Sequence, residues 1–265
     1  MSIVRCRSTQ RLYFLPGDAP LELTKYAGNA FLAMKITLIN EMADLCEKLG
    51  ADVQDVARGI GMDKRIGPKF LHPGPGYGGS CFPKDTLALV KTAQDAASPV
   101  RLIETTVAIN DQRKRAMARK VIQACGGSVR GKAIGILGLT FKPNTDDMRD
   151  SPSLAIIQAL KDAGAQIRAY DPVGMEHAKS MIDGIEFGDS AYSVAEGAHA
   201  VVIVTEWNAF RSMDLKRVHS LMASPVLVDL RNIYRPQDIV DAGFIYEGIG
   251  RADDPWSEPL LSVAV

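Results

Sequence analysis

Features that mark several common functional classes are scarce in this 265-residue sequence. Its 31 basic and 31 acidic side chains cancel, so no overall field attracts nucleic acid or a membrane surface. The four cysteines form no C-x-x-C pair and the four histidines show no ligand spacing, so no metal site is expected. No apolar run is long enough to span a bilayer, and the first residues lack the apolar core of a secretory signal. We expect a cytoplasmic protein with reduced thiols, in which a few placed cations meet any anionic ligand.

The composition that remains, 46% hydrophobic and 23% charged, is that of a globular protein, and its periodicity suggests three parts. Residues 1–20 show no clean period and are interpreted as an irregular leader. Residues 21–125 carry apolar side chains at helical spacing and are expected to be all helical. Residues 126–265 alternate short apolar runs with helical stretches, which predicts a parallel sheet covered on both faces.

Individual elements follow from apolar runs, prolines and glycines. The expected helices are 22–49, 53–59, one that begins at Pro83, 99–125 and 153–164. The expected strands are 132–138, 166–171, 200–205, 225–230 and 244–250. Gly50 is expected in a left-handed cap after the first helix. Leu87, Val90 and Ala93 are expected to form the buried face of the helix after Pro83.

The most informative segment is the glycine- and proline-rich loop PGPGYGGSCFPKD at 73–85. Its glycines let backbone amides approach a ligand, and Cys81 follows them just before a predicted helix. A thiol there faces the positive end of the helix dipole, which favours the thiolate, and Lys84 adds a cation. Asp85 lies one helical turn further on, where it can hold a water or a lysine. A lone cysteine is usually buried and inert, but this combination favours a nucleophile.

Lys25 and Asn29 share one face of the first predicted helix, because they are four residues apart. Asparagine is a poor helix former and needs a reason to lie within a helix. A solvated stripe is the usual explanation. Since this helix is apolar nearly all round, the stripe is also a candidate site wall, where an ammonium and an amide stabilise an oxyanion or hold a water.

At these residues the sequence resembles the UDP-glucose 6-dehydrogenase family. The similarity covers residues 21 to about 250, and its most specific piece is GGSCFPKD. The segments that carry it are LTKYAGNAFLAMKITLINE, GADVQDVARGIGMDKRIGPKFLHPGPGYGGSCFPKD and GLTFKPNTDDMRDSP. Related dehydrogenases for mannose or N-acetylhexosamine nucleotides share this plan and remain an alternative, although the residues before GGSCFPKD look most like the UDP-glucose branch.

The resemblance implies an all-helical dimerisation domain, which forms a homodimer, followed by an α/β Rossmann-like parallel-sheet domain that binds the UDP-sugar. It implies an NAD-dependent, two-step oxidation of UDP-glucose to UDP-glucuronate. Cys81 would attack the intermediate aldehyde, and the thiohemiacetal would be oxidised to a thioester that water hydrolyses. Lys25 would stabilise oxyanions, Asn29 would bind the oxyanion or water, and Asp85 would position the hydrolytic water.

The resemblance also implies binding residues, one of which, Arg65, would reach across the dimer interface. The implied substrate contacts are Lys25, Asn29, Arg65, Phe70, Leu71, His72, Pro73, Gly74, Gly78, Phe141, Lys142 and Arg231. The implied NAD contacts are Lys84 and Arg149. A plain solvated role is the alternative for Lys142 and Arg149. Their loop follows the first strand of the α/β part, at the sheet edge where ligands bind, which supports the site.

The family carries a G-x-G-x-x-G fingerprint after its first strand, and we find none after a predicted strand here. The glycines nearest to that context, Gly135 and Gly138, have the wrong spacing. We therefore expect a fragment without the N-terminal NAD-binding domain, inactive when alone. The alternative from another class is a non-catalytic module that binds UDP-sugar and dimerises.

Overall fold

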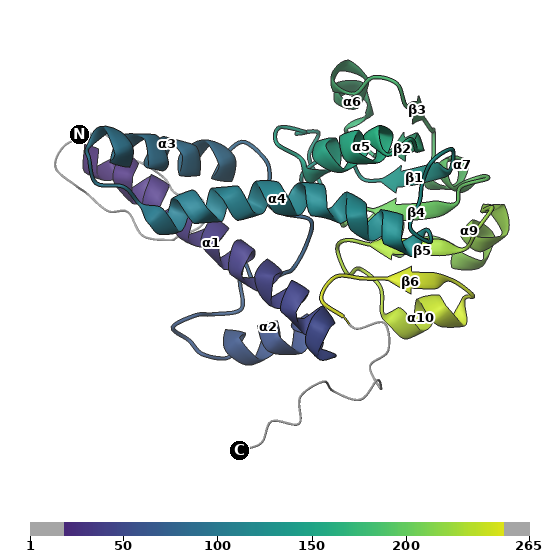
Figure 1. The fold of residues 1–265 in the computed structure, drawn as a ribbon, viewed down its shortest axis with the longest axis horizontal. Helices are drawn as coiled ribbons and strands as arrows, with labels where there is room; N and C mark the ends of the chain where they lie inside the picture. Colours follow the sequence, from purple (N-terminus) through teal and green to yellow (C-terminus); the bar gives the residue numbers. More distant parts are fainter. Residues whose placement is uncertain (1–18, 252–265) are drawn as a thin grey trace.

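The first part of the chain is a set of four helices (Figure 1). The computed structural model describes residues 19–251, so nearly all of the leader expected at 1–20 lies outside the described residues. The helices are α1 (Ala19–Leu49), α2 (Val53–Gly61), α3 (Phe82–Asp95) and α4 (Arg101–Ala124). The long α1 packs against each of the other three, with α3 beside its first half and α2 beside its last turns. Gly50 follows α1 at φ 72°, the left-handed cap that was expected.

A six-stranded parallel sheet forms the second part, with helices on both faces. Its strands are β1 (Ala133–Leu137), β2 (Gln166–Tyr170), β3 (Glu186–Phe187), β4 (Ala200–Ile203), β5 (Val226–Asp229) and β6 (Ile245–Glu247). Its helices are α5 (Pro152–Asp162), α6 (Met175–Met181), α7 (Ala191–Ala195), α8 (Asn208–Arg211), α9 (Leu215–Leu221) and α10 (Pro236–Asp241). The predicted order, a helical part and then a parallel α/β part, is confirmed.

In the strand order β3-β2-β1-β4-β5-β6, the two central strands are β1 and β4. Each is the first strand of one half of the sheet. From β1 the chain moves outward to β2 and β3, and it then returns to add β4 on the other side of β1. Strands β1, β4 and β5 are buried along their whole length, as their uninterrupted apolar runs require. At such a reversal the loops diverge and leave a crevice beyond the carboxyl ends of the central strands.

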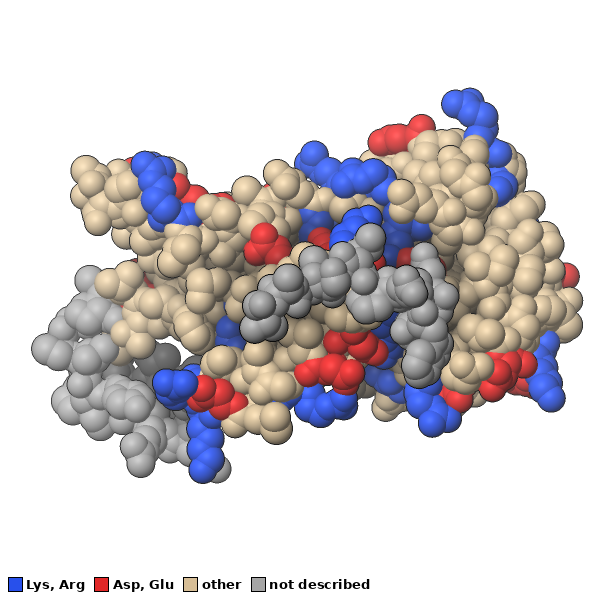
Figure 2. Space-filling model, turned by 60° about the horizontal axis from the view of Figure 1, so that its bottom comes forward, with Lys and Arg blue, Asp and Glu red and all other residues tan. Residues whose placement is uncertain are grey.

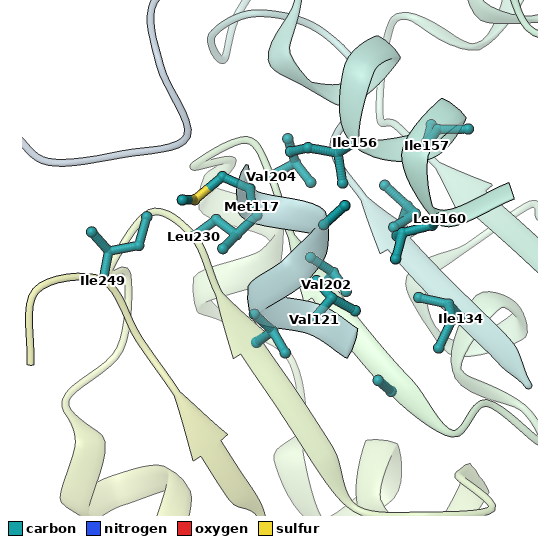
Figure 3. Packing of buried hydrophobic residues seen from close by; sticks show 14 of the residues in the cluster. Met117, Val121, Ile134, Ile156, Ile157, Leu160, Val202, Val204, Leu230 and Ile249 are labelled. Atoms are coloured by element: carbon teal, nitrogen blue, oxygen red, sulfur yellow. The ribbon is translucent and has the colours of Figure 1, made fainter. Parts of the chain in front are cut away.

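The second half of α4 joins the two parts, because it packs on the sheet. Met117 and Val121 of this helix face apolar side chains of β1, β4 and α5 (Figure 3). The same buried cluster continues through Ile39 and Ala43 of α1 and reaches the sheet. One continuous core therefore holds the helical part in a fixed position against the carboxyl edge of the sheet.

Two details differ from the sequence-based expectation. The edge strand β3 was not predicted, because two residues are too few to show a period. The predicted face of α3 is confirmed only at Ala93, which is buried, since Leu87 is 54% exposed and Val90 is half-buried. The buried face of α3 consists of Pro83, Asp85, Thr86, Leu89 and Ala93. Polar side chains occupy this face where α3 meets α1, so hydrophobic spacing alone misplaced it.

Charge on one face of the molecule and the hydropathy of the described helices bear on which ligands the surface attracts. Figure 2 shows one face on which basic and acidic side chains are interspersed rather than separated by sign. Among residues 19–251, no helix combines the length and hydropathy needed to cross a bilayer. Anion binding must therefore come from local arrangements of cations.

Candidate active site

Cys81 lies at the N-terminus of α3, as its position before Pro83 predicts. It is the N-cap residue, its carbonyl accepts a hydrogen bond from the Asp85 amide at 2.9 Å, and its thiol is exposed. The Ser80 hydroxyl lies 3.8 Å from its sulfur. A thiolate here faces the free amides and the positive dipole end of a 14-residue helix. The position suits an accessible nucleophile.

The structure brings Lys25, Asn29 and Asp85 together. Asn29 donates its Nδ2 to Asp85 Oδ2 at 2.6 Å, and Lys25 Nζ lies 3.4 Å from the same oxygen. The Asp85 side chain is fully buried, while that of Lys25 is 52% exposed. Lys84 Nζ lies 3.6 Å from Asp85 Oδ1, an oxygen that accepts no hydrogen bond from the described residues. One turn below Cys81 there is thus a buried carboxylate that orients an ammonium and an amide.

The glycine-rich loop before Cys81 is held by buried polar side chains that the sequence analysis did not select. Asn40 of α1 accepts from the Gly74 amide at 2.8 Å, and Arg113 of α4 donates to the Gly74 carbonyl at 2.7 Å. Asn110 of α4 accepts from the Tyr77 amide and donates to the Tyr77 carbonyl. Their polar character on otherwise apolar helix faces was the available signal. They replace the regular secondary structure that this loop lacks.

The glycines of this loop are required by contacts within the protein. A Cβ on Gly78 would lie 2.3 Å from the carbonyl oxygen of Asp150, and one on Gly79 would lie 2.7 Å from the Phe141 ring. Gly79 also has φ 82°. The letters of 74–79 fit the spacing G-x-G-x-x-G, but these residues follow no strand. The space into which a Cβ would project from each of these glycines is already occupied by other atoms of the protein. This loop therefore docks on the α/β part and is not a dinucleotide cradle.

A cavity of about 380 Å³ lies between this loop and the carboxyl edge of the sheet. Its sheet side is formed after three neighbouring strands: Phe141 and Lys142 follow β1, Glu206 follows β4 and Arg231 follows β5. The helical side brings residues that include Phe70, whose backbone is left-handed. Lining residues are Ile36, Lys69, Phe70, His72, Gly74, Gly76, Tyr77, Gly78, Phe82, Phe141, Lys142, Glu206 and Arg231. Seven of the twelve residues proposed for the substrate line this cavity.

Arg231 is fixed in the wall of this cavity. Its Nε donates to the Val204 carbonyl at 2.8 Å and lies 3.1 Å from Glu206 Oε2, while Nη2 donates to the Phe141 carbonyl at 3.3 Å. Nη1 faces Gly74, where a Cβ would come within 3.1 Å of it. Glu206 was missed, although its place after the apolar run of β4 is the same kind of signal that supported Lys142 after the first strand.

The remaining proposed substrate residues lie elsewhere. Lys25 and Asn29 surround Asp85, as described above, while Leu71 and Pro73 are buried. The side chain of Arg65 is 90% exposed and pairs with Asp63. Arg65 and Leu71 line a second, apolar groove of about 500 Å³ between α1 and the first half of α4.

The proposed NAD contacts, Lys84 and Arg149, are both exposed near the thiol. Arg149 pairs with Asp147 at 2.8 Å, and this hydrogen bond raises the pKa of the guanidinium and lowers that of the carboxyl. The Arg149 carbonyl accepts a hydrogen bond from the Gly79 amide at 2.8 Å, which places Arg149 beside the loop that ends at Cys81. Both cations can meet the phosphates of a cofactor beside the thiol.

The parallel sheet offers no open dinucleotide site of its own. In dinucleotide-binding sheets, an acidic residue that follows the glycine turn and its helix binds the cofactor ribose. Asp171, after β2, is the acid in that position, and it is fully buried. Its donors are the amides of Leu139, Thr140, Val173 and Gly174, the Thr140 hydroxyl and the Trp207 indole. Within 19–251, no cluster of metal-ligating side chains is found either.

Comparison with known proteins agrees with this arrangement. Two family models match: the UDP-glucose/GDP-mannose dehydrogenase family, central domain, at 20–112, and the UDP binding domain of that family at 135–236. A UDP-glucose 6-dehydrogenase of Rhizobium meliloti is 68% identical over 232 residues, covering 88% of this chain and 53% of that protein. The UDP-glucose 6-dehydrogenase TuaD of Bacillus subtilis is 44% identical over 239 residues, covering 90% and 52%.

Solved structures give the same result. A UDP-glucose dehydrogenase from Pyrobaculum islandicum superposes with a TM-score of 0.77 at 33% identity, covering 87% of this chain and 51% of that chain. A UDP-D-ManNAc dehydrogenase from Pyrococcus horikoshii superposes with a TM-score of 0.78 at 31% identity, covering 91% and 54%. The chain spans about half the length of the curated relatives it matches. By its central and UDP-binding domains, the chain belongs to the UDP-glucose/GDP-mannose dehydrogenase family.

Proposed function

We propose that this chain supplies the substrate pocket and the catalytic thiol of an NAD-dependent UDP-glucose 6-dehydrogenase, which oxidises UDP-glucose to UDP-glucuronate. The observation that carries the proposal is the juxtaposition at the start of α3. An exposed thiol, Cys81, precedes Phe82 of the cavity wall and lies one turn from Asp85, where Lys25 and Asn29 meet. A nucleophile, an oxyanion donor and a water-orienting acid thus adjoin one ligand cavity.

The charges of the cavity support a nucleoside diphosphate sugar as ligand. Lys69, Lys142 and Arg231 contribute three positive charges and Glu206 one negative charge. The resulting +2 matches the two negative charges of a diphosphate diester, as in UDP-glucose. Lys142 Nζ lies 5.2 Å from the Phe141 ring centroid, so a flat aromatic face and a cation are paired beside Arg231. The names of the relatives with high identity favour glucose as the sugar.

The residues have separate roles in the proposed reaction. Bound NAD would accept one hydride in each of the two oxidations. The Cys81 thiolate adds to the carbonyl carbon of the C6 aldehyde, and the resulting oxyanion faces the Lys25 ammonium and the Asn29 amide. Loss of hydride from this thiohemiacetal leaves a thioester on Cys81. Asp85 orients the attacking water, the C–S bond breaks, and the thiolate and the carboxylate product are released.

Among the described residues, the fit to NAD is limited to the phosphates of the cofactor. Lys84 and Arg149 are exposed beside the thiol and are suited to phosphate contacts. Asp171 has its oxygens engaged by protein donors, so it offers nothing to a ribose. The proposal therefore assigns phosphate contacts near Cys81 to this chain and draws no adenine pocket from it.

We also propose that the chain forms a homodimer through the apolar groove between α1 and α4. Phe31 is 55% exposed, Leu38 46% and Leu102 72%, and all three line the groove. An apolar face of this kind on a globular protein favours an interface. Arg65 lies on the same groove with a 90% exposed side chain, placed to extend onto a second copy.

A cytoplasmic setting suits the free thiols of the described cysteines.

Calorimetry with the 265-residue chain tests the ligand. We expect UDP-glucose to bind more tightly than glucose 1-phosphate, because the uridine meets the α/β part, and more tightly than GDP-mannose. Lys142→Ala and Arg231→Ala should each weaken UDP-glucose binding by roughly 10- to 150-fold, since each removes a charge-assisted contact of roughly 1.5–3 kcal/mol. The matched control is Arg119→Ala, an exposed arginine of α4.

Each alternative has its own outcome in this experiment. Equal affinity for UDP-glucose and glucose 1-phosphate would exclude a nucleotide-sugar site. Tighter binding of GDP-mannose would assign the chain to another branch of the family. Binding of UDP-glucose without trapping of its C6 aldehyde on Cys81 would favour a non-catalytic module.

A further inference from the structure

Lys35, on α1, is a buried lysine whose ammonium is surrounded by carbonyl oxygens. Its Nζ donates to the carbonyls of Ile66 at 2.8 Å, Gly67 at 3.2 Å and Lys69 at 2.6 Å. Only 8% of the residue is exposed. An ammonium has three N–H donors, so all of them are used by these carbonyls. Lys35 therefore has no donor left for a ligand.

The three carbonyls belong to the turn that leads into the wall of the substrate cavity. Lys69, whose carbonyl receives the shortest of the three bonds, lines that cavity, as do Phe70 and His72. Phe70 has φ 63°, a conformation that costs a bulky L-residue energy and persists only where the surroundings enforce it. Lys35 binds the carbonyl of the peptide group directly before this strained residue, so it restrains the backbone that leads into Phe70.

A cation is needed at this place because three carbonyl dipoles converge with their negative ends together. The described residues give Lys35 no carboxylate partner, so these dipoles alone stabilise its charge. An apolar side chain would leave three inward-facing oxygens without donors. The turn would then rotate its carbonyls toward water, and Phe70 would lose its left-handed conformation.

We propose that Lys35 is a positioning residue that shapes the sugar side of the cavity by holding the turn 66–69. The inference rests on the proposed function, and within that cavity we assign the sugar to the helical side at 70–74 and the UDP part to Phe141, Lys142 and Arg231 on the sheet side. Removing the ammonium changes the wall on one side only. Affinity for the whole nucleotide sugar falls more than affinity for UDP, because Lys142 and Arg231 on the sheet side still hold the UDP part when the turn that carries Lys69 changes.

The test compares Lys35→Met with Lys48→Met, a control at an exposed lysine of the same helix. Calorimetry measures Kd for UDP-glucose and for UDP with each variant. If the turn keeps its shape in one tenth of the Lys35→Met molecules, apparent Kd for UDP-glucose rises about tenfold. Kd for UDP should rise by a smaller factor, because Lys69 is the only one of the three cavity cations in this turn. Hydrogen exchange followed by mass spectrometry should show faster exchange at 66–72 in Lys35→Met alone.

The outcomes separate this inference from the proposed function. If the original chain binds neither UDP-glucose nor UDP, the proposed function fails. If it binds both, and Lys35→Met shifts both equally or neither, the positioning role is overturned. A misfolded Lys35→Met, detected by circular dichroism, is replaced by Lys35→Gln, whose amide supplies two donors for three acceptors. An unchanged ratio of the two Kd values in folded Lys35→Gln also overturns the proposal.

Discussion

The three cysteines in the described part of the chain lie in very different surroundings. Cys46 and Cys125 are buried, and burial raises the pKa of both thiols. Nearby Asp52 and Glu47 raise the pKa of Cys46 further, whereas Lys132 opposes the shift at Cys125. Cys81 is exposed at a helix N-terminus. The reactivity of a thiol follows its thiolate fraction and its access. Burial and the raised pKa disfavour Cys46 and Cys125 on both counts, while Cys81 is accessible.

We expect iodoacetamide to modify Cys81 first in the folded protein. Thiols with raised pKa stay protonated to higher pH, so Cys46 and Cys125 should react slowly even at mildly alkaline pH. Peptide mass spectrometry against pH and time measures each site, and it also separates Cys6, which lies outside the described residues. Equally fast labelling of Cys46 or Cys125 would contradict the assignment, and Cys81→Ser serves as the control.

At the residue scale, sequence reasoning succeeded where one local pattern carried the chemistry. The spacing of Lys25 and Asn29 placed them on one face, and the structure adds the carboxylate of Asp85 to which that face points. It failed where a role depends on long-range packing. Asn110 and Arg113 hold a loop more than 30 residues away, and no local pattern encodes that contact.

At the scale of elements, the long helices and the buried strands were predictable from the sequence. Helix α1 and strands such as β4 repeat their period over enough residues to be recognised. Two-residue β3 and the polar buried face of α3 were not predictable, because both depend on neighbouring elements. The cavity lies where loops from two parts meet, so the sequence indicated its residues but not their arrangement.

Lys120 joins three elements that are distant in the sequence. Its ammonium, on α4, lies 3.1 Å from Glu47 of α1 and forms a short contact with Glu247 of β6. The Lys120 side chain is 13% exposed. Glu47 also accepts from the Gly250 amide at 2.8 Å, so the end of the sheet is tied to α1. This cluster fixes the position of the α/β part against the helices.

We expect Lys120→Met to lower the free energy of unfolding by about 2–3 kcal/mol, between the exposed and fully buried limits for an ion pair. Burial alone lowers the pKa of Lys120, but its two carboxylates outweigh it, and the net pKa is raised. Because the pKa of Lys120 is higher in the folded state, its charge adds stability that is fully present below the unfolded-state pKa near 10.4. This stability is lost as pH rises through the higher pKa of the folded state. Urea unfolding should therefore show the full difference at pH 7 and a smaller one above pH 10.4.

At the scale of the whole molecule, the apolar groove predicts self-association. We expect a dimer at micromolar concentration in sedimentation velocity, and a shift to monomer for Leu102→Asp, which places a charge in the groove. Leu87→Asp is the matched control, because Leu87 is similarly exposed on α3 but lies outside the groove. A monomeric original chain, or equal effects of both variants, would contradict the proposed homodimer.

The described molecule also separates two parts of the proposed reaction. Addition of the thiol to an aldehyde requires Cys81, the Lys25 ammonium and the cavity, and all of these are present. Hydride transfer requires in addition a nicotinamide held within a few ångströms of C6, and such positioning supplies much of an enzyme's rate. Residues 19–251 offer a cofactor only Lys84, Arg149 and a closed Asp171.

We therefore expect the purified 265-residue chain, mixed with UDP-glucose and excess NAD, to form NADH at a negligible rate. The same preparation should trap the C6 aldehyde of UDP-glucose, because addition of the Cys81 thiolate to the carbonyl needs no hydride acceptor. Intact mass spectrometry of the mixture, with no borohydride added, should detect the thiohemiacetal adduct on the protein. Cys81→Ser should give no adduct. NADH formation at the rate of an intact family member would show that residues 1–265 hold the cofactor by themselves, and the fragment hypothesis would then be wrong. Trapping without turnover would place the thiol chemistry in this chain and the hydride acceptor on a surface that it does not supply.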